Sequence, residues 1–291
     1  MSDIIASPST RRMALEQGVD LDARAQELGR TTLGPEDLHA SAAPAAAGDT
    51  GLWDVDHAAH GPVHEEPMSR FAQVAARNLG AANALIPQVT HHDRADLTVI
   101  EGLRTAWRSE ARARGIKLTA LAFHVMALAR CLRADPRFNA SLSPDGKTLI
   151  LKDYVHVGIA VDTPHGLMVP VIRDADRKGL WDLSAEIAEL ADRAQARKIA
   201  PDEMGGASMT ISNLGGIGGT AFTPIVNPPE LAILGITRTE TVTVWEGDSP
   251  RPVPMVPLDL SYDHRVINGA DAARFLARYA RFIAEPRRMM L

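Results

Sequence analysis

The chain has 291 residues, of which 45% are apolar and 23% charged, and its net charge is −5. This is the composition of a globular protein with one large domain, or a large and a small one, and it offers no basic excess for binding nucleic acid. The single cysteine, Cys131, excludes a disulfide framework and a thiolate zinc cluster. No apolar run approaches the roughly 20 residues that span a bilayer, and the N-terminus lacks a secretory signal pattern. We therefore expect a soluble, cytoplasmic protein that does not bind a membrane.

The first 66 residues are expected to form a small helical unit and a linker. Ser7 and Pro8 predict the N-cap and first turn of a short helix that ends at Gly18, and a second short helix is expected near Pro35. A unit of residues 1–40 buries little apolar area, so its stability alone would be marginal. Residues 41–66 are rich in Ala, Pro, Gly and acids without an apolar period, which is typical of a linker.

From residue 67 to 291 helical and β patterns alternate. Helices are predicted over 96–115, 118–136, 182–199 and 269–285, and the second is apolar enough to be buried. Strands are predicted for two β-rich runs between 148 and 175, joined by the turn 163–166, and for 207–214, 230–239, 241–247 and 253–262. Strict βαβ order is missing, so we predict an α/β (α+β) fold with a mixed sheet that carries helices.

A histidine occupies the junction between the predicted strand 253–262 and the last helix, in SYDHRVINGADAARF. A strand end held this way would fix His264 rigidly, and because an imidazole titrates near neutral pH it suits a general base. Ten histidines are present, so the alternative is a loop or core imidazole that holds the strand end. Asn268 is a predicted N-cap of the following helix, with Asp271 at the capping-box position.

Four glycines follow a predicted strand in MTISNLGGIGGTAFTPIVNPP, residues 209–229. The spacing fits neither G-x-G-x-x-G nor a Walker loop, no lysine follows, and Pro224 stands where a helix would run. We therefore expect a tight turn that brings Ser212 close to another stretch of backbone, and no phosphate loop. The alternative for Ser212 is an ordinary structural hydroxyl on a strand.

Residues 67–291 resemble the catalytic domain of the dihydrolipoyl acyltransferases, the core components of 2-oxo acid dehydrogenase complexes. The likeness is greatest to the acetyl-transferring members of bacterial pyruvate dehydrogenase complexes. The resemblance implies a fold like chloramphenicol acetyltransferase, assembled as a homotrimer, with a larger cage left open. It rests on DHRVING and TISNLGGIGGTAFTPIVNPPELAILG, together with LIPQVTHHD, PRFNASL and VHVGIAVDTPHGLMVPVIRDADRKGL.

The resemblance also implies an active site in a channel between subunits. His264 would be the general base and Ser212, from the facing subunit, the oxyanion donor. Position 268, usually Asp in the family, is Asn here, which keeps the cap and a hydrogen bond and loses the charge. A neutral His264 would take the thiol proton as sulfur attacks a thioester, and Ser212 would stabilise the tetrahedral oxyanion. Cys131 needs no role and is expected to be a buried, inert thiol.

CoA requires cations for its phosphates. Arg104, Arg108 and Arg112 fall at i, i+4 and i+8 on one helical stripe, which fits either a phosphate site or a solvated face. By family position Arg104 and Ser141 are implied CoA contacts. Asp162 would line the channel or stabilise its turn. No metal site is predicted.

Two departures from the family affect the expected partners. Members normally begin with lipoyl domains and this chain carries none, so a separate lipoyl carrier is expected in trans, unless the sequence is a piece of a longer protein. Residues 1–40 resemble a peripheral subunit-binding domain through ASPSTRRMALEQGVDL and PEDL, with AQELGRTTLG in place of its glycine-rich, basic loop. The partners implied are a thiamine-dependent decarboxylase and a dihydrolipoyl dehydrogenase.

Three functions follow. The first is acyl transfer, of acetyl or a similar short group, between dihydrolipoamide and CoA. The second is a catalytically weak structural core of the complex, and the third an acetyltransferase for a small hydroxyl or amine acceptor. The apolar end of EPRRMML is expected to be buried in a neighbouring trimer.

Overall fold

The computed structural model describes residues 4–17, 19–28, 31–34, 37–38 and 54–290. It divides into two compact units, Met1–Pro67 and Met68–Leu291. No helix of the described part is long and apolar enough to cross a membrane.

The first unit is built on two short helices, α1 (Pro8–Gln17) and α2 (Leu21–Leu28), and a two-residue parallel pairing of β1 (Ile5–Ala6) with β2 (Thr32–Leu33). The Ser7 hydroxyl accepts the Thr10 N–H at 3.1 Å, as expected of an N-cap. The stretch 25–34, which stands in place of the family's glycine-rich loop, is helical up to Leu28 and contains β2. The helix expected near Pro35 and the linker up to residue 53 lie outside the described residues; within 54–66 there is one short 3₁₀ turn, η3 (His57–His60).

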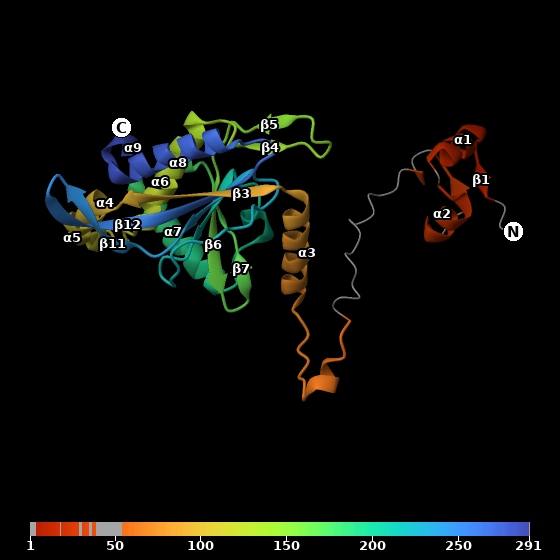
Figure 1. The fold of residues 1–291 in the computed structure, drawn as a ribbon, viewed down its shortest axis with the longest axis horizontal. Coiled ribbons are helices and arrows are strands. Elements are labelled where there is room, and N and C mark those ends of the chain that lie inside the picture. Colours follow the sequence, from red (N-terminus) through yellow and green to blue (C-terminus); the bar gives the residue numbers. More distant parts are fainter. Residues whose placement is uncertain (1–3, 18, 29–30, 35–36, 39–53, 291) are drawn as a thin grey trace. The chain divides into compact units, whose positions relative to one another are not determined.

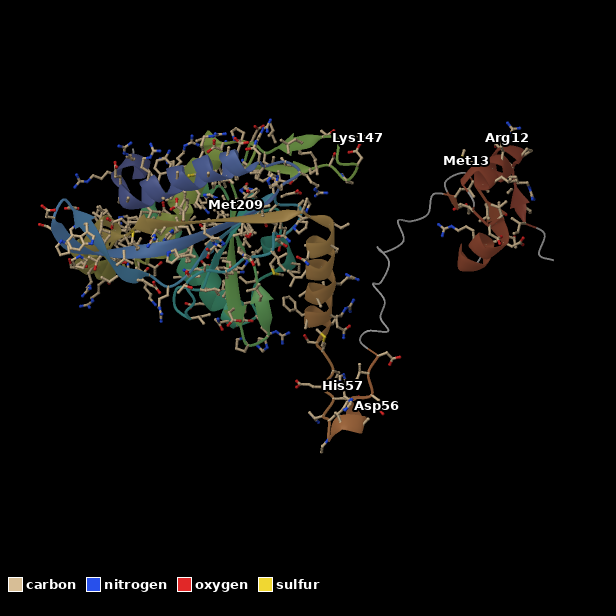
Figure 2. The ribbon with its side chains drawn as sticks, viewed as in Figure 1. Arg12, Met13, Asp56, His57, Lys147 and Met209 are labelled. Carbon is tan, nitrogen blue, oxygen red and sulfur yellow. The ribbon has the colours of Figure 1, made fainter. Side chains whose placement is uncertain are left out.

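A mixed sheet forms the centre of the second unit, in the order β11-β12-β10-β9-β6-β7, with β3 also paired to β12 and β8 to β6 (Figure 1). β9 is parallel to both β6 and β10, and the remaining pairs are antiparallel. β4 and β5 form a separate hairpin with Lys147 near its tip (Figure 2). The strands are β3 (Gln88–Asp96), β4 (Ala140–Leu142), β5 (Leu149–Leu151), β6 (Val157–Thr163), β7 (Gly166–Met168), β8 (Val171–Ile172), β9 (Met209–Asn213), β10 (Ala232–Ile236), β11 (Glu240–Glu246) and β12 (Ser249–Asp263).

Helices pack on one face of this sheet around the apolar helix α6, which contacts both α7 and α8 (Figure 1). The strands turn alternate side chains toward this layer, so Met209, Ile211, Leu258, Leu260 and Tyr262 join its core. Burial of α6 confirms the prediction from its apolar sequence. The helices of the second unit are α3 (Arg70–Leu85), whose end contacts the strap described below, and α4 (Thr98–Ala106), α5 (Arg108–Ala113), α6 (Ala120–Ala134), α7 (Leu180–Gln195), α8 (Gly269–Ala284) and α9 (Arg287–Met290).

The opposite face of the sheet carries small and polar residues, and residues 220–230, here called the strap, lie across it. Three side chains of the sheet hold the strap's backbone: Thr237 donates to Thr220 O at 3.2 Å, Asp259 accepts from Phe222 N at 3.2 Å, and Gln88 accepts from Val226 N at 2.7 Å. Apolar contacts add to these bonds, because Val226 packs with Ile233 and with Ala82 and Ile86 at the end of α3. The strap thus buries the second face over several strands.

Several predicted elements differ from those observed. The helix expected over 96–115 is two helices that break at Trp107, and Gly115 (φ 68°) follows the second. Neither α3 nor β3 was predicted. α9 folds back onto α6 of its own chain, where Arg130 donates to Met289 O at 3.1 Å and the Met289 side chain is 1% exposed. Met289 is therefore buried without the neighbouring trimer that its apolar sequence was expected to need.

Candidate active site

The backbone on either side of His264 is fixed by hydrogen bonds. Asp263, the last residue of β12, is 1% exposed, and its carboxylate accepts the backbone N–H and the guanidinium N–H groups of Arg265 at 2.6–3.1 Å. His264 N donates to Pro87 O at 3.1 Å. The imidazole itself is exposed in the single chain, with its ring centroid 5.7 Å from that of Tyr262. A rigidly held backbone with an accessible ring is what a general base on a strand-to-helix junction requires.

Asn268 is the N-cap of α8, as predicted. Its side-chain oxygen accepts the Asp271 N–H at 3.0 Å. The Asp271 carboxylate forms an ion pair with Arg274, so the second half of a capping box is not made here. An asparagine therefore preserves the start of the helix that follows His264.

Ser212 lies near the end of β9, next to the glycine turn. Asn213 Oδ1 accepts the Gly215 N–H at 2.9 Å, and Gly218 and Gly219 adopt φ values of 150° and 87°, which side chains other than glycine's disfavour. Ile217 N donates to Leu214 O at 2.9 Å, and the chain then enters the strap, so the expected tight turn is confirmed. Ser212 is in register with Ala160 of β6 and Gly235 of β10, both small residues, so its hydroxyl is not crowded by these two neighbours.

Within one chain the structure does not bring Ser212 and His264 together. Ser212 aligns with Gly235, and Gly235 aligns with Asp259 of β12, five positions before His264. At about 3.3 Å per strand residue the two sites are separated by roughly 16 Å along the strand direction, in addition to two strand spacings. One substrate atom could not contact both side chains of the same chain.

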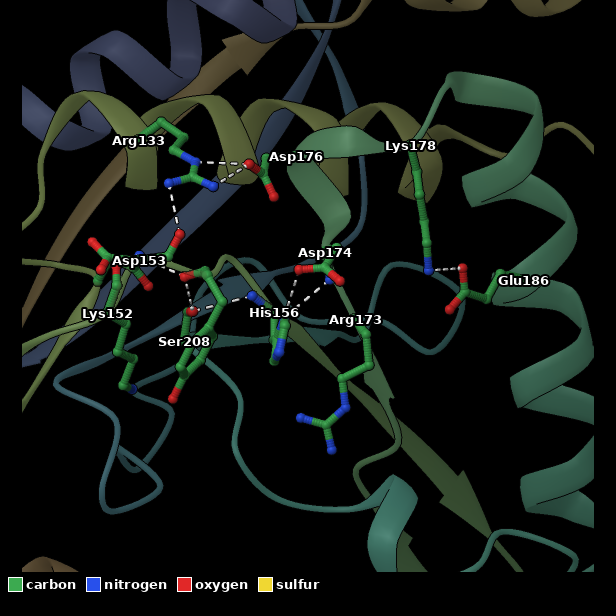
Figure 3. Close-up of polar contacts among 12 residues, drawn as sticks. Arg133, Lys152, Asp153, His156, Arg173, Asp174, Asp176, Lys178, Glu186 and Ser208 are labelled. Carbon is green, nitrogen blue, oxygen red and sulfur yellow. Dashed lines mark hydrogen bonds and ion pairs between the residues drawn. The ribbon is translucent and has the colours of Figure 1, made fainter.

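Two other histidines are unsuited to act as the base. His124 is buried on α6, and burial lowers its pKa to about 4; its Nδ1 lies 2.6 Å from the Tyr279 hydroxyl. His156 lies beside β6 in a network with Ser208, whose hydroxyl accepts the His156 backbone N–H at 3.1 Å, and with Asp174 (Figure 3). Its Nδ1 accepts the Asp174 N–H at 3.0 Å, and burial is the main cause that lowers its pKa. Both imidazoles are therefore neutral at pH 7 and already serve the fold.

The three arginines predicted to share one helical stripe, Arg104, Arg108 and Arg112, line a cavity of about 490 Å³ between α4, α5 and the loop that follows. The Arg104 guanidinium already uses some of its hydrogen-bond donors, because it donates to the Glu101 carboxylate at 2.5 Å and to Leu118 O at 3.3 Å. The break at Trp107 leaves all three arginines on the same side of the chain. The basic residues that line the cavity are Arg104, Arg108, Arg112 and Lys117.

Ser141 and Asp162 lie elsewhere. The Ser141 hydroxyl is buried on β4 and donates to Pro229 O at 2.7 Å, so it anchors the end of the strap, and it does not line the cationic cavity. Asp162 is exposed on β6, and its backbone carbonyl accepts from Gln195 at 2.6 Å. The side chain that holds the predicted turn is that of Thr163, which donates to Gly166 O at 2.7 Å.

Sequence reasoning missed a buried acid at the end of the strap, two residues before β10. Glu230 is 4% exposed, one of its carboxyl oxygens accepts from Thr210 at 2.9 Å and Asn227 at 3.0 Å, and the other has no partner in the described structure. Burial raises the pKa of Glu230 to about 7. The only sequence signal was the PPE at the end of the strap, which gives no hint of burial.

Comparisons with known proteins identify the family of the chain. The profile described as 2-oxoacid dehydrogenases acyltransferase (catalytic domain) matches residues 60–291. The chain belongs to this family. It is 46% identical, over 98% of its length, to the dihydrolipoyllysine-residue acetyltransferase components of the pyruvate dehydrogenase complexes of Pseudomonas aeruginosa and Azotobacter vinelandii. It spans 55% and 47% of those two proteins, or about half their length.

Solved structures of family members share the fold. The cubic core of a pyruvate dehydrogenase multienzyme complex superposes with a TM-score of 0.80 at 51% identity, over 81% of this chain and 98% of that one. The Azotobacter vinelandii dihydrolipoamide acetyltransferase gives 0.80 at 50% identity over the same shares. For that enzyme, the role of one serine, one histidine and one asparagine in the catalytic mechanism was investigated. The predicted mixed sheet with helices is confirmed as the fold of this family.

Proposed function

We propose that the acyltransferase unit moves a short acyl group, acetyl in the first place, between CoA and a dihydrolipoyl group. The observation that carries the proposal is a spacing. The serine, histidine and asparagine investigated in the Azotobacter enzyme are separated by 52 and then four positions, and Ser212, His264 and Asn268 have the same separations. Here they occupy a strand end, a strand-to-helix junction and a helix cap.

The chemistry follows from these positions. His264 takes the proton of the attacking thiol as its sulfur bonds to the thioester carbonyl carbon, and the Ser212 hydroxyl donates to the oxyanion that forms. When the tetrahedral intermediate collapses, the carbon–sulfur bond to the departing thiol breaks and His264 returns the proton to that sulfur. The acyl group passes directly from one thiol to the other, so no acyl-enzyme is formed.

The separation of Ser212 and His264 within one chain supports a site shared between subunits. We propose a homotrimer in which His264 of one subunit faces Ser212 of the next, with a cage left open. Arg104, Arg108, Arg112 and Lys117 would hold the CoA phosphates. The lipoyl group would arrive on a carrier, and residues 1–40 would dock a decarboxylase or a dihydrolipoyl dehydrogenase.

The test is acetyl transfer from acetyl-CoA to free dihydrolipoamide by the full chain. His264→Ala should slow transfer by about 10²- to 10⁴-fold, the usual contribution of a general base. His57→Ala, which removes an exposed histidine of η3, is the matched control and should leave the rate unchanged. An inactive wild-type trimer would instead support the structural-core function, and equal rates for wild type and His264→Ala would remove His264 from the mechanism.

A further inference from the structure

An aspartate–histidine pair lies in the same register row as Ser212. Asp259 of β12 is 1% exposed, and its Oδ1 lies 2.6 Å from Nδ1 of His92 on β3, the residue directly opposite. The row runs from Ser212 through Gly235 and Asp259 to His92. The acyl-transfer chemistry proposed above makes no use of this pair.

Asp259 also holds the strap where it passes Ser212. Its other carboxylate oxygen accepts the Phe222 N–H at 3.2 Å. The Phe222 ring lies over Gly235, where a Cβ atom would come within 2.6 Å of the ring and within 3.1 Å of the Asp259 side chain. The absence of a side chain at Gly235 thus leaves room for the ring, and Asp259 fixes the backbone of Phe222.

Placement of this ring bears directly on Ser212. Ser212 and Gly235 are neighbours on adjacent strands, about 4.8 Å apart, and point their Cα substituents to the same face. A ring seated on Gly235 therefore forms an apolar wall one strand spacing from the Ser212 hydroxyl. The acyl chain of a thioester whose carbonyl oxygen contacts Ser212 would meet that wall if it extends toward β10.

We infer that His92 and Asp259 are positioning residues that set acyl-chain selectivity by fixing Phe222 beside Ser212. A buried carboxylate is costly unless it is hydrogen-bonded and paired, and this one has the strap N–H on one side and the imidazole on the other. Loss of either partner would let the carboxylate turn toward water, and Phe222 would lose its anchor. The inference rests on the proposed acyl transfer.

The experiment compares kcat/KM for acetyl-CoA and butyryl-CoA with dihydrolipoamide as acceptor. Asp259→Leu removes both hydrogen bonds, and the preference for acetyl should fall by about tenfold, since one or two methylenes in an apolar pocket discriminate by at least that much. Asp259→Asn retains an acceptor for Phe222 N and should keep most of the preference. His92→Leu changes a half-exposed position that is tolerant of change, and it should also lower the preference for acetyl. This variant tests the inference if Asp259→Leu does not fold.

Ser261→Ala is the matched control. Ser261 is equally buried on β12, faces the same side, and bonds Thr90 of β3 at 2.8 Å, two rows further from Ser212. The Ser261→Ala variant should have a lower melting temperature than the wild type and the same acetyl-to-butyryl ratio of kcat/KM. If the wild type is active and both folded variants, Asp259→Leu and His92→Leu, keep its acetyl-to-butyryl ratio of kcat/KM, the inference is wrong and the proposed function still stands. No transfer by the wild type with either acyl-CoA would overturn the proposed function as well.

Discussion

Ser212 and His264 lie toward opposite ends of the sheet of one chain, because the register row of Ser212 meets β12 at Asp259 rather than at His264. The strap connects the two regions. It follows the glycine turn after Ser212 and is held by Asp259 and then by Gln88; near its end, Pro229 O accepts the Ser141 hydroxyl. The strap therefore runs, within one chain, from the region of Ser212 to strand β3 beside His264.

Complementation between variants tests this arrangement. Ser212→Ala and His264→Ala chains should each be nearly inactive, yet trimers formed from an equal mixture after unfolding and refolding together should regain activity. If each site takes its serine and its histidine from different chains, about a quarter of the sites combine two intact residues, so about a quarter of wild-type activity is expected. Mixing the folded proteins without subunit exchange is the control. Persistent inactivity of co-assembled trimers would show that both groups act from the same chain.

The cationic cavity yields a prediction on binding. Arg108→Ala and Arg112→Ala should raise the KM for CoA by about tenfold and change kcat little, because a phosphate contact far from the reacting sulfur stabilises ground and transition states alike. Arg114→Ala is the control, since Arg114 bonds Glu110, stacks over Trp181 and does not line the cavity. Steady-state kinetics with CoA and with CoA lacking its 3′-phosphate would show which phosphate is bound. Equal KM values for all three variants would place CoA elsewhere.

Local signals in the sequence predicted the elements that local interactions decide. The apolar run of α6, the amphipathic period of α8, its Asn268 cap and the turn at 163–166 depend on residues a few positions apart. β3 was missed because its sequence, QVTHHDRAD, is mostly polar, and it becomes a strand through nine paired residues with β12. The break at Trp107 was missed because the helical pattern continues across it.

Features of the site that depend on distant residues were not predictable. His92 and Asp259 are 167 positions apart, and nothing in either segment indicates that they meet. Likewise, the motifs around Ser212 and His264 do not reveal that their strands carry them toward opposite ends of the sheet. The stripe of three arginines was predicted, but the cavity that it lines needs the loop bearing Lys117.

Cys131 is expected to be chemically inert. It is fully buried on α6, and burial raises the pKa of its thiol well above the usual range, so almost no thiolate exists at neutral pH. A thiol reagent should fail to label the native protein over the time in which it labels the unfolded chain completely. Cys131→Ala should keep the full transfer rate. Rapid native labelling together with loss of activity would point to a covalent role for this cysteine.

Glu230 predicts a pH dependence of stability. Burial raises its pKa from 4.5 to about 7, against the opposing hydrogen bonds from Thr210 and Asn227 and the charge of Lys152. Between these two pH values the folded state keeps the proton that the unfolded state releases. The contribution of Glu230 to the free energy of unfolding is therefore full below pH 4.5 and is lost as the pH rises toward 7. The loss is about 3 kcal/mol, from a shift of between two and three pH units at 1.36 kcal/mol each.

Glu230→Gln, which cannot ionise and keeps an acceptor for Thr210, should remove this dependence. The melting temperature of the wild type should fall relative to that of the variant between pH 5 and pH 8, and the difference should level off above pH 8. Glu203→Gln is the matched control, and its effect on the pH dependence of the melting temperature should be opposite. The Arg193 guanidinium lowers the pKa of Glu203, so the charged form of Glu203 stabilises the folded state. Parallel melting curves for wild type and Glu230→Gln across this range would mean that Glu230 is ionised in the folded protein, with its second carboxyl oxygen paired to Lys152 or to water.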